Sequence, residues 1–143
     1  MILRKKIETI FTNRITDDYP GQDVMKGHDT TDRDDQPGVT VMCHQNTENQ
    51  EFQSRSGVYQ CGLMLIVESN VQDADNTQAS IETLAGNLAA SIEDLSAVRT
   101  LCTASYPEIY IHDILPSDDL PDMDGYNLNN TFNYLLVYEY LNI

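Results

Sequence analysis

The sequence contains few basic residues. Lysine and arginine together occur eight times, against 23 aspartates and glutamates, so the 143-residue chain carries a formal net charge of −15. A surface of this charge repels phosphates, which argues against nucleic-acid recognition. Two interpretations of the acidity remain open. In the first, the acidic surface serves to prevent adhesion to DNA. In the second, the protein comes from a high-salt cell, for which abundant aspartate and scarce lysine are typical.

Long apolar runs are also absent. No run approaches the roughly 20 residues that a membrane-spanning helix requires. The opening segment MILRKKIETIF lacks the apolar stretch and the cleavage site of a signal peptide. We therefore expect no membrane segment and no secretion. Because 41% of the residues are apolar, the chain should fold, and its length predicts a single domain over residues 1–143.

The sequence contains no common metal-binding or catalytic motif. Cys43, Cys61 and Cys102 are widely spaced within apolar segments and form no CxxC pair, which predicts reduced core thiols rather than a zinc site. The histidines show no ligand spacing, and GxSxG, P-loop and GxGxxG patterns are missing. A nucleophile pair of Cys43 or Cys61 with His112 stays open, because proximity in space is invisible in a sequence. We expect no cofactor and no enzymatic activity.

Hydrophobic periodicity predicts two helices. Residues 2–14 form a short amphipathic helix. A second helix is expected in DADNTQASIETLAGNLAASIEDLSAV, with Asp73 or Asp75 as its N-cap. Its apolar residues form one continuous stripe that should pack on a flat surface: Ile81, Leu84, Ala85, Leu88, Ile92 and Leu95.

Alternating and apolar runs predict four strands: GVTVMCH, VYQCGLMLIVES, EIYIHDIL and TFNYLLVYEYL. The second run is apolar on both faces near its end, which indicates a central strand. The order α-β-β-α-β-β predicts an α+β fold, in which a four-stranded, mostly antiparallel sheet has both helices on one face. Residues 16–38 form a long polar loop excursion in this interpretation, with one short extended piece around Val24 and Met25.

The stretch LPSDDLPDMDGYN resembles the start of a calcium loop, but the spacing does not fit. Counting from Asp122, an EF-hand loop needs glycine at position 6 and glutamate at position 12. Gly125 falls at position 4 and Asn133 at position 12. Asp-Gly between two strand runs is typical of a turn. We therefore expect a hairpin loop that presents charge, and no metal site.

Two further groups of residues are candidates for contacts. The polar link between the first two predicted strands should project beyond the sheet as a hairpin loop, carrying Glu48, Glu51, Phe52 and Arg55. Half of the basic residues stand in the first fourteen positions, namely Arg4, Lys5, Lys6 and Arg14. We expect this basic face to meet the acidic surface of a neighbouring subunit; a solvated helix face is the alternative.

The order of elements resembles the tail terminator family of long-tailed phages and related archaeal viruses. The resemblance lies in an opening helix with early basic residues, a PGVTV strand and a long apolar second strand. A DAD-capped helix, an IYIHDI strand, an acidic turn and a final apolar-aromatic strand follow. It covers most of the chain and contains no diagnostic motif. The excursion over residues 16–38 is longer than the family pattern leads us to expect.

The resemblance implies a structural virion protein that is made in the host cytoplasm. Such subunits form a hexameric ring that caps the tail tube and joins it to the neck, next to a tail-tube protein and a neck or head-closure protein. DNA passes through the lumen without specific binding. The acidic loop would then face the lumen or the next ring, through Asp118, Asp119, Asp122, Asp124 and Tyr126.

Two other functions remain open. A head-closure or tail-completion protein would also form a ring, and the neighbour that co-purifies would distinguish it. A cytoplasmic α/β enzyme or ligand-binding protein would be a monomer or dimer with a concave pocket, and thiol alkylation would inactivate it.

Overall fold

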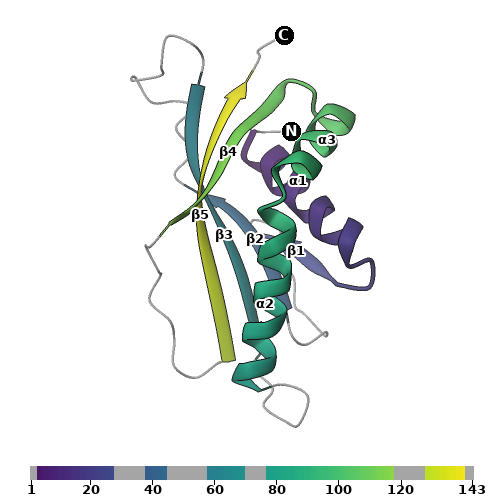
Figure 1. The fold of residues 1–143 in the computed structure, drawn as a ribbon, viewed down its shortest axis with the longest axis vertical. Coiled ribbons are helices and arrows are strands. Elements are labelled where there is room, and N and C mark those ends of the chain that lie inside the picture. The colour runs from purple at the N-terminus through teal and green to yellow at the C-terminus, as the bar shows by residue number, and fades with distance from the viewer. Residues whose placement is uncertain (1–2, 28–37, 45–57, 70–76, 118–127, 141–143) are drawn as a thin grey trace.

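The computed structural model describes residues 3–27, 38–44, 58–69, 77–117 and 128–140. These residues form three helices and five strands (Figure 1). In chain order the elements are α1 (Leu3–Asp18), β1 (Val24–Lys26), β2 (Gly38–His44), β3 (Val58–Ser69), α2 (Gln78–Ile92), α3 (Leu95–Ser105), β4 (Ile109–Ser117) and β5 (Leu128–Tyr140). The expected α+β class is confirmed.

The strands form one sheet in the order β1-β2-β3-β5-β4. Three pairings are antiparallel, with Val41 opposite Leu65 and Leu63 opposite Tyr134 as examples. The first two long strands are therefore paired as expected, and β3 lies at the centre of the sheet as its two-sided apolar pattern predicts. The prediction of four strands is wrong. The short extended piece around Val24 is a fifth strand, which pairs in parallel with β2 and makes the sheet mixed.

All three helices lie on one face of the sheet (Figure 1). Helix α1 contacts β1 and β2, α2 contacts β3 and β5, and α3 contacts β4. The core lies between the two layers and is built from alternate strand residues and the buried helix stripes. Its largest fully buried side chains include Ile7, Phe11, Leu63, Leu65, Leu88, Tyr134 and Tyr138.

The second predicted helix is in fact two helices. Helix α2 ends at Ile92, and Asp94 leaves helical geometry with φ −78° and ψ 85°. The Asp94 side chain accepts a hydrogen bond from the N–H of Ala97 at 3.3 Å, so it caps the start of α3. Aspartate competes for backbone N–H groups in this way, and the competition favours a new helix start over continuation.

The N-cap of α2 also differs from the prediction. Thr77, rather than Asp73 or Asp75, caps the helix: its Oγ1 accepts a hydrogen bond from the N–H of Ser80 at 3.1 Å. The Ser80 hydroxyl in turn accepts from the N–H of Thr77 at 2.9 Å. This reciprocal pair satisfies two N–H groups that the helix itself leaves free.

The cap gives a direct stability prediction. Thr77→Ala removes the acceptor and should lower the free energy of unfolding by about 1 kcal/mol. Thr83→Ala is the matched control, because Thr83 is exposed within the same helix and alanine is the better helix former. The control should change stability by less than about 0.5 kcal/mol. Urea denaturation of both variants measures the difference; equal losses would contradict this cap.

Candidate functional site

The face of the sheet that points away from the helices is the main candidate for an interaction surface. We call it the open face, because no described helix or strand packs over it. It includes these outward residues of four strands: Thr40, Met42 and His44 on β2; Gln60, Gly62, Met64, Ile66 and Glu68 on β3; Leu135, Val137 and Glu139 on β5; and Asp113 and Leu115 on β4.

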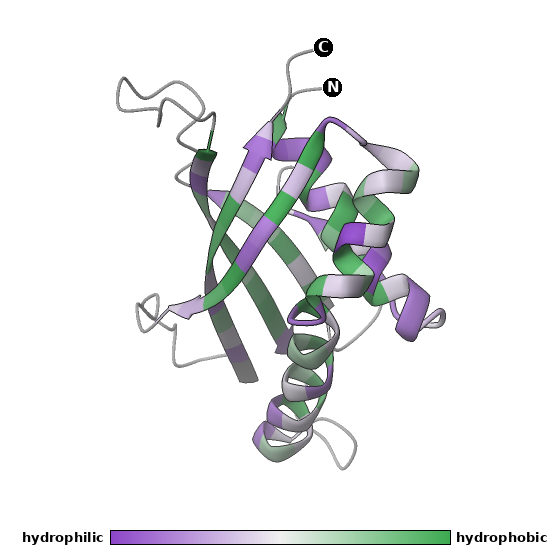
Figure 2. Ribbon diagram, turned by 45° about the horizontal axis from the view of Figure 1, so that its top comes forward, coloured by the Kyte–Doolittle hydropathy of each residue, from purple (hydrophilic) through white to green (hydrophobic). Residues whose placement is uncertain are grey.

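The centre of the open face is apolar. The register places Met42 beside Met64, Gly62 beside Leu135, and Leu135 beside Leu115. Met42, Met64 and Leu135 are half-buried, Gly62 is buried, and Leu115 is 40% exposed. Apolar segments also run along the strands in Figure 2. Contiguous apolar surface that stays partly exposed marks interaction sites more often than scattered single residues do.

Two side chains of β2 lie flat on this face. The imidazole of His44 covers Gly62, where an added Cβ would collide with Cε1 of the ring. Met42 covers Gly27 in the same manner, with 2.6 Å between an added Cβ and its Cγ. Both glycines are therefore required for close approach. Burial lowers the pKa of His44, so this imidazole is held toward its neutral form and adds no charge to the face.

Charged side chains from the helices form hydrogen bonds with the sheet backbone near both edges of the sheet. Beyond the end of β1, the N–H of Cys43 donates to the Glu8 carboxylate at 2.8 Å. On the opposite edge, Arg99 donates to the carbonyls of Ile111 and His112 at 2.9 and 3.1 Å. These carbonyls lie at a β-bulge between Ile111 and Asp113. Backbone groups that another strand could pair with are thus already bonded, which disfavours strand addition there.

The rim of the open face carries polar groups near β4. His112 Nε2 lies 3.2 Å from a carboxylate oxygen of Glu139, and its ring meets the edge of Tyr110 with 4.9 Å between ring centroids. The guanidinium of Arg99 lies 4.9 Å from the centre of the Tyr110 ring. An apolar centre with a polar rim is the usual arrangement of a protein–protein interface.

The four residues of the predicted basic face have different surroundings in the structure. Lys6 forms an ion pair with Glu108 at 2.8 Å and lies 5.8 Å from the ring centres of Tyr106 and Tyr140. The hydrogen bond between Lys6 and Glu108 raises the pKa of Lys6 and lowers that of Glu108. Arg14 is buried. Arg4 and Lys5 are half-buried, and the Nε atom of Arg4 has no hydrogen-bond partner among the described residues.

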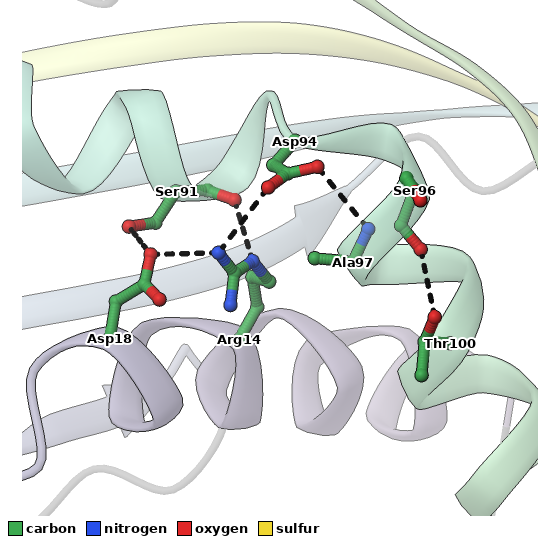
Figure 3. A network of polar contacts seen from close by, with 7 residues as sticks. All are labelled: Arg14, Asp18, Ser91, Asp94, Ser96, Ala97 and Thr100. Carbon is green, nitrogen blue, oxygen red and sulfur yellow. Dashed lines mark hydrogen bonds and ion pairs between the residues drawn. The ribbon is translucent and has the colours of Figure 1, made fainter.

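Arg14 joins all three helices (Figure 3). Its Nε donates to the Ser91 carbonyl at 3.0 Å, at the end of α2. One Nη donates to Asp18 at 2.7 Å and lies 3.7 Å from Asp94, the cap of α3. The Ser91 hydroxyl donates to the same Asp18 oxygen at 2.6 Å. A single guanidinium therefore fixes α1 against the junction between α2 and α3.

The cysteines are free and buried, as expected. A hydrogen bond with Cys43, together with burial, raises the pKa of the Cys61 thiol, and burial raises that of Cys102 to about 11. Cys43 and Cys61 point into the core, whereas His112 lies beside Glu139 on the other side of the sheet. The structure does not bring together the nucleophile pair that the sequence left open, and protonated buried thiols are poor nucleophiles.

The two loops with predicted site residues lie outside the described residues. These positions are Asp118, Asp119, Asp122, Asp124 and Tyr126 in one loop, and Glu48, Glu51, Phe52 and Arg55 in the other. In the described part of the chain, no group of three or more His, Cys, Asp or Glu side chains is arranged to hold a metal ion.

None of the helices in the described ranges combines the length and the apolar character needed to cross a membrane.

Comparison with known proteins does not assign a family. No protein-family model matches the chain, and no curated protein matches it.

Sequence reasoning missed Glu8, Arg99 and the open face. Charged residues within helices give no sign of which strand they will reach. The open face did leave a signal, because Met64 and Ile66 make β3 apolar on both sides. We interpreted that pattern only as a central position in the sheet.

The network around Arg14 predicts a specific loss of stability in acid. The hydrogen bond from Ser91, with the Arg14 charge, holds the pKa of Asp18 below its ordinary value. Folding therefore favours ionised Asp18. Its contribution is complete above the ordinary aspartate pKa and is lost as the pH falls through the lower folded value.

Asp18→Asn should accordingly flatten the dependence of the unfolding free energy on pH between about 5 and 2, relative to wild type. Asp17→Asn, the same change at the neighbouring exposed position, should leave the slope close to that of wild type. Thermal denaturation across this pH range measures all three proteins. Parallel curves for Asp18→Asn and wild type would refute the role of this carboxylate.

Proposed function

We propose that the protein is a structural virion subunit that forms a ring, with a hexamer as the expected state. The ring caps a viral tail tube and joins it to the neck, and DNA passes through its lumen. Its partners are further copies of itself, a tail-tube protein and a neck or head-closure protein. It works by assembly and not by catalysis, and it reaches the virion from the host cytoplasm.

The open face is the observation that carries this proposal. A sheet with helices on one side and partly exposed apolar side chains on the other has one surface that a partner can cover. The charged groups at Cys43 and at the β4 bulge disfavour covering by strand addition. Packing on the face itself is the remaining mode for association. This property is expected of an assembly subunit, and the resemblance in element order supplies the particular assembly.

The charge of the chain supports a DNA-conducting role. A lumen lined by carboxylates repels the phosphates of DNA, so that the duplex slides without being held. We assign the acidic residues of the loop at 118–127 to the lumen or to the surface facing the next ring. We assign a basic contact with a neighbouring subunit to the face of Arg4, Lys5, Lys6 and Arg14, of which Lys6 and Arg14 also bind carboxylates of their own chain.

The assembly should depend on salt in a defined direction. Copies with a charge of −15 each repel one another, and salt reduces the screening length from about 10 Å at 0.1 M to about 3 Å at 1 M. We expect a ring population that increases with salt, with a mass of six times the 16.1 kDa of one chain.

Light scattering coupled to size-exclusion chromatography measures this mass at several salt concentrations. Electron microscopy of the largest species should show a ring with a central hole. A strict monomer at high protein concentration in both low and molar salt would rule out the ring. Co-purification with portal-side proteins instead of tail-tube protein would favour a head-closure or tail-completion protein.

A further inference from the structure

We propose that the subunit is adapted to concentrated salt and depends on dissolved monovalent cations for the stability of its own fold. The sequence left two interpretations of the acidity open, a surface that avoids DNA and a protein from a high-salt cell. The positions of the charged side chains favour the second for the described part of the chain. This dependence belongs to the fold of a single chain, so it does not require the ring proposed above.

No basic residue in the described ranges is exposed. Arg14 is buried, and the others are half-buried: Arg4, Lys5, Lys6, Lys26 and Arg99. Some of these cations are bound within the chain, because Lys6 pairs with Glu108 and Arg99 donates to two carbonyls of β4. The outer surface of this part of the chain therefore presents little positive charge.

The exposed carboxylates lie on every part of the described structure. In the helix layer they stand at the end of α1, on α2 and at the junction between α2 and α3. One precedes the edge strand β1, and two lie on the open face, on β3 and on the edge strand β4. These residues are Asp17, Asp18, Asp23, Glu68, Glu82, Glu93, Asp94 and Asp113. Within the described ranges, only Asp18 and Asp94 of this set lie within 4 Å of a basic group, and both share Arg14.

This distribution bears on the two interpretations of the acidity. A lumen explains carboxylates on the one side of a subunit that faces the DNA, and the loop at 118–127 has that position in the ring proposed above. It does not explain carboxylates on the helix layer, on the open face and before β1 at the same time. A solution rich in cations explains all of them, because mobile ions screen charge wherever it lies on the surface.

Repulsion between carboxylates is concentrated where the three helices meet. Asp17 and Asp18 end α1, while Glu93 and Asp94 link α2 to α3. Asp18 and Asp94 contact the same Arg14 guanidinium, at 2.7 and 3.7 Å (Figure 3). The side chains of Asp18 and Asp94 are 41% and 51% exposed, so dissolved ions reach them. One guanidinium offsets only one of the four negative charges, and screening by salt should therefore stabilise this junction.

Unfolding by urea, followed by circular dichroism at low protein concentration, tests the dependence on salt. Between about 0.1 M and about 1 M potassium chloride, the screening length falls from about 10 Å to about 3 Å. The unfolding midpoint of the wild-type chain should rise across this range by on the order of 1 M urea. At each salt concentration the midpoint should not change with protein concentration, as a property of the single chain requires.

Replacing exposed carboxylates by amides shows whether charge is the cause. A sixfold variant leaves Asp18 and Asp94 in place beside Arg14 and carries Asp17→Asn, Asp23→Asn, Glu68→Gln, Glu82→Gln, Glu93→Gln and Asp113→Asn. At low salt it should unfold at a higher urea concentration than wild type, and its midpoint should rise with salt by less than half as much. The matched control exchanges Asp and Glu at the same six positions. It keeps every charge and should retain the wild-type dependence on salt.

Two results would overturn the proposal. One is a wild-type midpoint that is the same at both salt concentrations. The other is an amide variant that keeps the full wild-type dependence, because salt would then act on the burial of apolar surface and not on charge. If the sixfold variant does not fold, the helix-layer changes Asp17→Asn, Glu82→Gln and Glu93→Gln replace it, and a smaller rise than in wild type is again required.

The ring has a separate readout, which is the mass of the assembly. A ring formed by a chain whose fold does not depend on salt would remove this inference and leave the proposed function standing. A chain that is monomeric at every salt concentration, with a fold that salt stabilises through its carboxylates, would do the reverse.

Discussion

The main constraint on this structure is that helices cover only one side of its sheet. Alternate residues of each strand must face opposite ways, so every inward residue of β3 and β5 that builds the core has an outward neighbour without a helix above it. If these outward residues were all polar, the face would be stable in water and a monomer would need no partner. Here Met64, Ile66, Leu135 and Val137 occupy the middle of this face between polar neighbours, so that apolar surface stays partly exposed in the subunit.

The helix layer is held to the sheet by a few charged side chains that act at junctions. Arg14 fixes α1 to the end of α2 and to the cap of α3, while Glu8 and Arg99 bond to sheet backbone near opposite edges. These interactions explain why so acidic a chain buries some of its scarce cations. A buried cation remains stable only when carboxylates and carbonyls surround it, and Arg14 has both. Few basic residues then remain to offset the negative surface.

Local patterns predicted most of the fold. Alternation set the bounds of β2 and β3, and the stripe from Ile81 to Ile92 placed α2 on the sheet. The wrong predictions arose where two local structures compete, because a hydrophobic pattern does not show which of them is more stable. Asp94 offered the backbone a new cap within a continuous stripe, and Val24 formed a strand because β2 had an edge free. The interaction surface was harder to predict, since it depends on which face the helices leave uncovered.

Oxidation of methionine in the assembled protein tests the central claim most directly. Met42 and Met64 lie side by side on the open face, and peroxide converts accessible methionine to the sulfoxide, which mass spectrometry of peptides quantifies. If copies cover this face, both residues should oxidise several-fold more slowly in the wild-type assembly than in wild-type monomers diluted below the assembly concentration in the same buffer. Equal rates in the two states would show that the open face stays exposed in the assembly, and would contradict the account.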